Sequence, residues 1–189
     1  MKRTFLIAAM ACTAAGAQAQ SSVTLFGVVD AAYEHLSGNA LAGSINKLTS
    51  SGNNSSRLGF KGVEDLGGGL NASFWLEAGL NNQNGTNGTT SANNQTGAAS
   101  GGGLTFNRRS TVSLSGNFGE IRLGREFAPS YINLFTFDPF GNDGAGSESN
   151  LSTALAALNG VQTSFRVSNG IDYLLPNNLG GFYGQMMYA

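Results

Sequence analysis

Alternation of apolar and polar residues is the dominant pattern along this chain. In SSRLGFKGVEDLGGGLNASFWLEAGL (residues 55–80), two alternating runs flank a glycine-rich turn. A period of two residues is typical of β-strands. The same period predicts seven strands, at about 23–36, 55–64, 70–80, 106–115, 119–127, 164–175 and 181–189.

The two faces of these predicted strands differ in chemistry. Leu58 and Phe60 share one face of their strand, whereas Arg57 and Lys61 lie on the other. Several strands are about ten residues long, which is the length of a tilted strand that crosses the hydrocarbon core of a membrane. The pattern therefore predicts an all-β fold, a transmembrane antiparallel β-barrel with lipid on its apolar side and water on its charged side.

The connections between the predicted strands alternate in length. The long ones lie at about 37–54, 81–105 and 128–163, and the short ones at 65–69, 116–117 and 176–180. This order places all long loops at one end of the sheet, as in outer-membrane barrels with short periplasmic turns and long outer loops. A soluble lipocalin-like barrel with the same order by chance is the alternative.

The N-terminus has the organisation of a secretory signal peptide. Lys2 and Arg3 precede a short apolar stretch, and the small-x-small sequence AQA follows at 17–19. We predict that residues 1–19 are cleaved on export, and that residues 20–189 form the barrel region. Cleavage removes the only cysteine, so we expect no disulfide in the mature chain. An ordinary first helix is the alternative reading.

Composition disfavours several other classes of protein. After removal of the predicted signal peptide, eight basic residues face eleven acidic ones, a net charge near −3. Nucleic-acid-binding domains carry a basic patch instead, so no nucleic-acid partner is expected. The chain has one histidine, His35, and no cysteine or histidine cluster with metal-ligand spacing. We therefore predict no catalytic residue, metal site or cofactor, and an outer-membrane protease or phospholipase is disfavoured.

Four segments resemble the Gram-negative general porins, most closely those of the betaproteobacterial branch. They are SSVTLFGVVDAAYEH, SSRLGFKGVEDLGGGLNASFWLEAGL, FNRRSTVSLSGNFGEIRLGRE and SFRVSNGIDYLLPNNLGGFYGQMMYA. The RxGFKGxEDLGxGL block is the most specific part. The resemblance implies a sixteen-stranded antiparallel barrel in the outer membrane, usually a homotrimer, through which ions and small hydrophilic solutes diffuse passively.

The resemblance also implies basic residues on the channel wall. Arg57 matches the arginine of the most specific block, and Arg166 matches the arginine that opens the strand after the third loop. Alternation places both on the polar face, and an unpaired arginine facing lipid near the midplane would cost about 2–4 kcal/mol. The pore-lining basic candidates are Arg57, Lys61, Arg108, Arg109, Arg122 and Arg166.

The fourth predicted strand leaves two arginines unresolved. The F-x-R pattern of the family favours Arg108, whereas strict alternation with Val112 puts Arg109 on the polar face. A bulge or a protein-covered face would reconcile the two readings. Arg125 lies on the apolar face by alternation, and we expect it to pair with Glu126 or with a neighbouring chain.

The longest connection, at about 128–163, is expected to be the constriction loop that the family folds into its channel. Its acidic candidates are Asp138, Asp143 and Glu148. Solvent-exposed turn acids are the alternative reading of these three residues. Leu151, Leu155 and Leu158 recur at helical spacing, which predicts one short amphipathic helix packed against the wall. A basic wall that faces few acids would favour anions.

About seven strands cannot close a barrel, because a closed barrel leaves no edge and bacterial single-chain barrels have an even number of strands. We therefore expect the chain to correspond to the N-terminal half of a porin, as a fragment or as a truncated, non-functional product. Another hypothesis makes the barrel an anchor for surface loops of an adhesin or receptor, with function in the Asn/Gly/Thr-rich segment 81–105.

Overall fold

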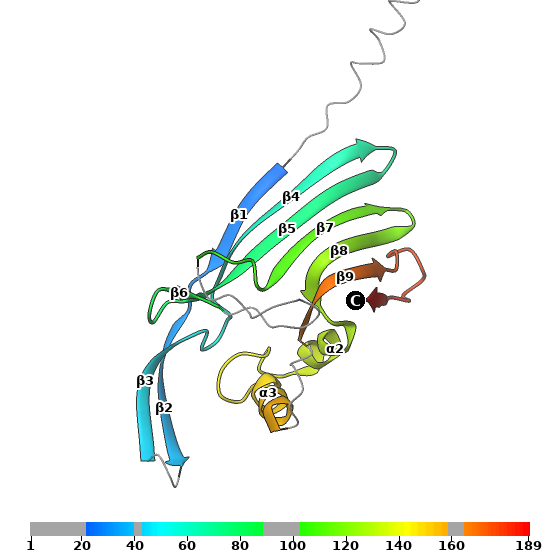
Figure 1. The fold of residues 1–189 in the computed structure, drawn as a ribbon. Helices are drawn as coiled ribbons and strands as arrows, with labels where there is room; N and C mark the ends of the chain where they lie inside the picture. The colour runs from blue at the N-terminus through cyan, green and yellow to red at the C-terminus, as the bar shows by residue number, and fades with distance from the viewer. Residues whose placement is uncertain (1–21, 40–42, 89–102, 159–164) are drawn as a thin grey trace, which may run out of the picture.

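Strands of one antiparallel sheet make up most of the computed structural model, which describes residues 22–39, 43–88, 103–158 and 165–189. In spatial order the sheet contains β1 (Ser22–Val28), β4 (Arg57–Gly67), β5 (Leu70–Asn81), β7 (Arg109–Gly116), β8 (Gly119–Phe127), β9 (Arg166–Leu174) and β10 (Gln185–Tyr188). The two-residue β6 (Thr86–Asn87) pairs with β5. The sheet is curved and open, and the predicted antiparallel all-β class is confirmed (Figure 1). The predicted signal peptide lies outside the described residues.

The first predicted strand is wrong as a single element. β1 ends at Val28, and β2 (Ala31–Asn39) pairs with β3 (Gly43–Ser50) in a separate two-stranded sheet. This hairpin projects away from the main sheet (Figure 1). Much of the predicted loop at 37–54 is therefore β-structure. The other strands differ mainly at their ends, since β7 begins at Arg109 and β10 at Gln185.

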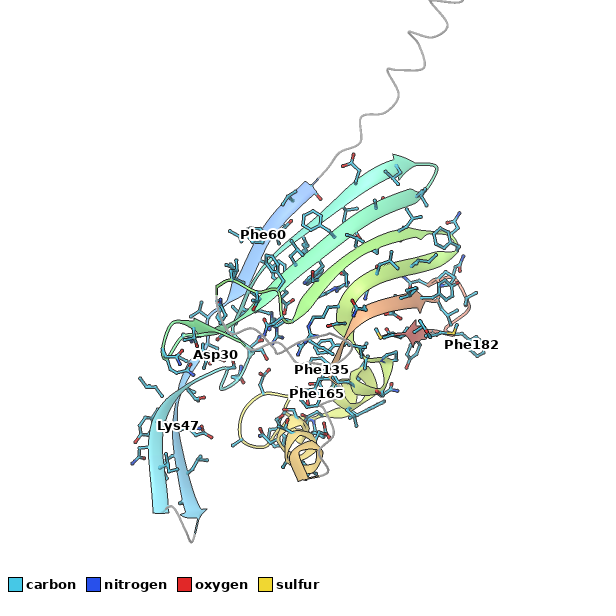
Figure 2. All side chains as sticks on the ribbon, in the orientation of Figure 1. Asp30, Lys47, Phe60, Phe135, Phe165 and Phe182 are labelled. Carbon is cyan, nitrogen blue, oxygen red and sulfur yellow. The ribbon has the colours of Figure 1, made fainter. Side chains whose placement is uncertain are left out.

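A cluster of hydrogen bonds at Asp30 explains the break between β1 and β2. The Asp30 N–H donates to Ser56 Oγ at 2.9 Å, and that hydroxyl donates to Asp30 O at 3.0 Å. The carboxylate accepts the backbone N–H groups of Asn53 and Asn54. These bonds occupy the backbone groups that would otherwise continue the ladder. Asp30 accordingly lies where the hairpin joins the sheet (Figure 2).

The register gives the sheet two chemically different faces. Lys61, Trp75 and Thr111 are paired across β4, β5 and β7, and therefore point to the same side. On β8 and β9 the same side, called the polar face below, carries Arg122 and Asp172. The opposite side, the apolar face, carries Leu25, Phe60, Leu76, Val112, Leu123 and Ile171.

The short connections between strands lie at one end of the sheet, and the long connections lie at the other. The turns β4–β5 and β7–β8 lie at one end, while the hairpin and the helical segment lie at the other (Figure 1). The first of these turns depends on glycine, because Gly67, Gly68 and Gly69 all have positive φ, between 62° and 83°. The observed arrangement follows from the antiparallel order, in which alternate connections return to the same end.

Two helices, rather than the one predicted, occupy the connection between β8 and β9. They are α2 (Pro129–Phe137) and α3 (Glu148–Leu158). Tyr131 of α2 is buried against Phe127 and Phe165, with ring centroids 5.1 and 4.5 Å away. Leu151 of α3 is 60% exposed, so the predicted packing of this residue against the wall is wrong. Neither described helix is long and apolar enough to cross a membrane.

Candidate functional site

Glu77 is the centre of the first charged cluster on the polar face. Arg108 Nε lies 2.6 Å from Glu77 Oε1, and Arg57 Nε lies 3.8 Å from the same oxygen. The indole N–H of Trp75 donates to Glu77 Oε2 at 3.0 Å. Arg57 also donates to Asn54 Oδ1 and to the carbonyl of Ser55. Two cations therefore share one carboxylate, because β4 and β5 are register neighbours and residue 108 lies just ahead of β7.

Glu126 is the centre of the second cluster. Arg109 Nε and Arg122 Nη1 lie 2.8 and 3.0 Å from Glu126 Oε2. Arg122 also binds Glu120 through two parallel hydrogen bonds, Nε to Oε1 and Nη2 to Oε2, each 3.0 Å long. The residues 120, 122 and 126 lie an even number of positions apart on β8, so they share the polar face. Bidentate guanidinium–carboxylate pairs are geometrically specific, which holds Arg122 in place.

Both Arg108 and Arg109 lie on the polar side, although alternation and the family pattern each favoured a different one of them. Arg109 is the first residue of β7 and is register-paired with Glu77. Arg108 precedes the strand, so alternation does not constrain its side chain. Its backbone N–H donates to Glu77 O at 3.1 Å, which turns the side chain toward the Glu77 carboxylate. A terminal position, and not a bulge, brings the two arginines together.

Lys61 has different neighbours from the arginines. Its ammonium lies 5.0 Å from the ring centroid of Trp75 and 5.7 Å from that of Phe26. Phe26 and Trp75 contact each other edge to face, with centroids 5.1 Å apart. Gly59 permits this contact, since a Cβ there would lie 2.3 Å from Phe26 Cζ. Arg109 also stacks on Trp75, with its guanidinium carbon 4.5 Å from the ring centroid.

Arg166 opens β9 and lies beside the helical segment. Its guanidinium carbon is 4.1 Å from the ring centroid of Phe127, its partner in the β8–β9 register. Phe127 in turn contacts Tyr131 of α2. Arg166 is therefore placed at the root of the predicted constriction loop, where the charges of Arg108 and Glu77 in the first cluster also act on it.

The loop acids make hydrogen bonds that hold the loop together. Asp138 accepts backbone N–H groups from Phe140, Asn142 and Glu148, at 2.9 to 3.0 Å. The Phe140 N–H, followed by those of Glu148 and Asn142, holds the pKa of Asp138 below its ordinary value. Asp138 therefore stabilises the turn that leads into α3.

The other two loop acids also have local partners. Asp143 Oδ1 accepts the hydroxyl of Ser55 at 2.7 Å, which ties the loop to the residues ahead of β4. Glu148 begins α3 and accepts the hydroxyl of Ser152. The carboxylates that pair with Arg57, Arg108, Arg109 and Arg122 are instead those of the strands, Glu77, Glu120 and Glu126.

Four carboxylates of the wall were not among the predicted site residues, although alternation in the sequence already places Glu77 and Asp172 on the polar face. They are Glu77, Glu120, Glu126 and Asp172, and alternation alone places them on the polar face with the arginines. Asp172 is 1% exposed and is register-paired with Arg122. The same two-residue period also identifies Glu120 and Glu126 as acids of the polar face.

Arg125 is buried beside an irregularity in the pairing of β8 with β9, where β9 has one extra residue. The β8–β9 register shifts between Gly124 and Glu126. Arg125 Nε donates to the carbonyl of Asn107 at 2.6 Å, and Nη1 donates to Ser168 Oγ at 2.8 Å. The expected Glu126 partner is occupied by Arg109 and Arg122. Hydrogen bonds to Asn107 and Ser168 therefore hold a residue that alternation alone assigned to the apolar face.

Comparison with known proteins identifies the family. The sequence pattern of the Gram-negative porins matches residues 6–189. The chain is 40% identical over 189 residues to outer membrane porin protein 32 of Delftia acidovorans, covering all of this chain and 50% of that protein. It is 32% identical over 208 residues to an outer membrane porin protein of Bordetella pertussis, covering 97% of this chain and 47% of that protein.

A solved structure agrees with these sequence relatives. The anion-selective porin from Comamonas acidovorans superposes with a TM-score of 0.74 at 41% identity, covering 90% of this chain and 47% of that one. The chain thus spans about half the length of the relatives that it matches. It belongs to the family of Gram-negative porins, and its open antiparallel sheet is a portion of the β-barrel of that family.

Proposed function

We propose that the complete gene product forms a water-filled channel in the outer membrane, through which ions and small hydrophilic solutes diffuse. It is a passive channel and not an enzyme. The polar face of the sheet is the lumen wall, and the apolar face meets lipid. Its N-terminal signal peptide is cleaved on export, and the mature protein assembles as a homotrimer, as its resemblance to the general porins implies.

The observation that carries this proposal is the inverted exposure of the two faces. Leu25 and Ile171 of the apolar face are 64% and 53% exposed, whereas the Arg122 side chain of the polar face is 14% exposed. In a soluble protein a sheet buries its apolar face, because removing apolar surface from water stabilises the fold by roughly 25 cal/mol per Å². An outward apolar face is stable where lipid covers it, and charged side chains are then retained on the water-filled side.

The segment 128–163 acts in this proposal as the inward loop that narrows the channel. Tyr131 packs on Phe127 and Phe165 at its root, and Ser55 binds Asp143 near its tip. Attachment at both points supports a fixed obstruction over a freely moving surface loop. Phe135 and Phe165, both labelled in Figure 2, belong to this root, since Phe135 stacks on Phe127 and Phe165 contacts Tyr131.

An anion preference follows from the charges of the wall. The six basic candidates outnumber the five carboxylates that the register places on the described polar face, which are Asp65, Glu77, Glu120, Glu126 and Asp172. Rings of charge select ions through the local field, and a positive surplus favours anions. The similar porin from Comamonas acidovorans is described by its name as anion-selective.

Planar-bilayer recording of the complete gene product tests the proposal. We expect stepwise increases in conductance. Across a potassium chloride gradient, the sign of the reversal potential should show that chloride permeates better than potassium. A cation-selective reversal potential would contradict the selectivity. Absence of conductance from folded protein would contradict the channel.

A further inference from the structure

We propose that the polar face carries a discrete anion-binding station centred on Lys61, Thr24 and Trp75, which takes small inorganic anions and carboxylates from the lumen. The station deepens the proposed channel function, on which it rests for its access to water. Three features of the described wall support it: a cation without a carboxylate partner, a rigid aromatic platform and a neighbouring hydroxyl that can donate a hydrogen bond.

The charge of Lys61 is not neutralised by the described wall. Arg57 and Arg108 share Glu77, and Arg109 and Arg122 share Glu126. No carboxylate among the described residues lies within 4.0 Å of the Lys61 ammonium, and the side chain is exposed. A mobile anion gains most from a cation that has no fixed partner, because a paired cation presents a field that its own carboxylate largely cancels.

Aromatic rings fix the position of this charge. Lys61 lies over both Trp75 and Phe26, which contact each other. Cation–π contacts of this kind contribute about 0.5–1 kcal/mol at exposed sites. They attract the ammonium toward the wall and leave its charge unneutralised, whereas a salt bridge would neutralise it. The ammonium of this exposed lysine is therefore favoured at a position over the two rings.

Thr24 supplies the second donor. It is the register partner of Lys61 in β1, on the same face, and its side chain is exposed. Its hydroxyl has no hydrogen-bond partner in the described parts of the chain, whereas Ser73 and Ser113 bond each other and Thr111 accepts from Arg109. An anion beside Lys61 can thus receive one charged and one neutral hydrogen bond.

A hollow of about 350 Å³ on the polar face gives the anion room. Its lining includes Thr24, Lys61, Trp75, Thr111 and Arg109, together with Arg122 and the carboxylate Glu120 that Arg122 binds. The volume suits a small hydrated anion or a short carboxylate. Because one ammonium and one hydroxyl supply the contacts, the binding is weak and exchangeable. Conduction requires this weakness, because an ion that binds too tightly does not leave.

Iodide quenching of tryptophan fluorescence tests the station directly. Trp75 is the only tryptophan of this chain, and it lies under the Lys61 ammonium. The detergent-folded complete gene product is titrated with iodide at constant ionic strength maintained with fluoride. For Lys61→Gln we expect an iodide quenching constant about two- to fivefold lower than wild type, since a nearby unit charge concentrates a counter-ion by about this factor.

Matched variants assign the effect. Trp75→Phe identifies the quenched signal, Lys61→Arg is expected to retain iodide quenching, and Thr24→Val to lower it less than Lys61→Gln. Lys47→Gln removes the same charge from the separate hairpin, where Lys47 pairs with Glu34, and is expected to leave quenching unchanged. Neutral acrylamide should quench wild type and Lys61→Gln equally, which shows that exposure of the indole is unaltered.

The outcomes separate this inference from the channel proposal. Equal iodide quenching of wild type and Lys61→Gln would overturn the station, even if the same preparations conduct in planar bilayers. Lys61-dependent quenching in a protein that does not conduct would support the station and overturn the channel. A loss of acrylamide quenching together with iodide quenching would also count against the station, because it attributes the effect to burial of the indole.

Discussion

Arg108 and Glu77 form the closest ion pair of the described polar face, with Arg108 Nε 2.6 Å from Glu77 Oε1. Arg57, which matches the family motif, lies 3.8 Å from the same oxygen and is the more weakly attached partner. One carboxylate therefore partly neutralises the charge of two wall arginines. The net field of the wall depends on this acid as much as on the arginines.

Glu77→Gln is expected to strengthen anion preference. The substitution leaves Arg57 and Arg108 without their shared carboxylate, so the local positive field increases. Loss of a partner for partly enclosed arginines should also destabilise the folded protein by about 1–3 kcal/mol. Reversal potentials across a salt gradient and thermal unfolding measure the two effects. Glu34→Gln on the hairpin is the charge-matched control, and an equal shift in both variants would contradict this role of Glu77.

Leu25→Arg and Thr24→Arg test which face meets lipid. The two residues are adjacent on β1, both are exposed, and they lie on opposite faces. An arginine on a lipid face costs about 2–4 kcal/mol near the bilayer midplane, whereas a lumen substitution changes selectivity. We expect Leu25→Arg to lower the yield of folded protein in membranes or its resistance to denaturant. Equal tolerance of both substitutions is incompatible with a lipid-covered apolar face.

Ser55→Ala should loosen the attachment of the inward loop. The Ser55 hydroxyl donates to Asp143 Oδ1 at 2.7 Å and joins segments 88 positions apart. Loss of a hydrogen bond to a charged acceptor weakens the contact by about 1.5–3 kcal/mol, so the loop should open more often. Limited proteolysis between residues 128 and 158 measures this opening. Thr136→Ala is the control, since that hydroxyl bonds Ile132 within α2.

Asp138 makes the turn before α3 sensitive to acid. Backbone N–H groups lower the pKa of its carboxyl in the folded protein, so the ionised form is the one that the fold stabilises. The contribution is complete above the unfolded pKa, about 3.9, and is lost as pH falls through the lower folded value. Neutral and mildly acidic conditions should therefore leave the turn unchanged.

Hydrogen exchange of residues 138–148, corrected for the intrinsic pH dependence, measures this effect. We expect protection to be constant from pH 7 to about pH 5 and to fall below about pH 4. In Asp138→Asn the protection should be lower throughout and lack the acid-dependent step. A step of the same size in Asp138→Asn would assign the transition to another group.

The alternation of residue types was sufficient to predict the class of fold and the faces of most site residues. It placed Lys61, Arg109 and Arg122 on the polar face and Leu58 on the other, as the observed register does. It failed at 23–36, because the Asp30–Ser56 bonds that end β1 join residues 26 positions apart. It also left Arg108 open, since that side chain lies outside the strand whose alternation was used.

The sequence by itself therefore determined most of the strands and their two chemically different faces, because the direction of a side chain on a strand repeats every two residues and is a local property of the backbone. Only the tertiary structure decided which charges neutralise each other. Glu77 meets Arg108 across 31 positions, and Asp143 meets Ser55 across 88. Such partners depend on strand register and loop docking, which long-range packing sets. Tertiary structure thus separated the paired Arg57 from Lys61, whose charge remains available to a mobile anion.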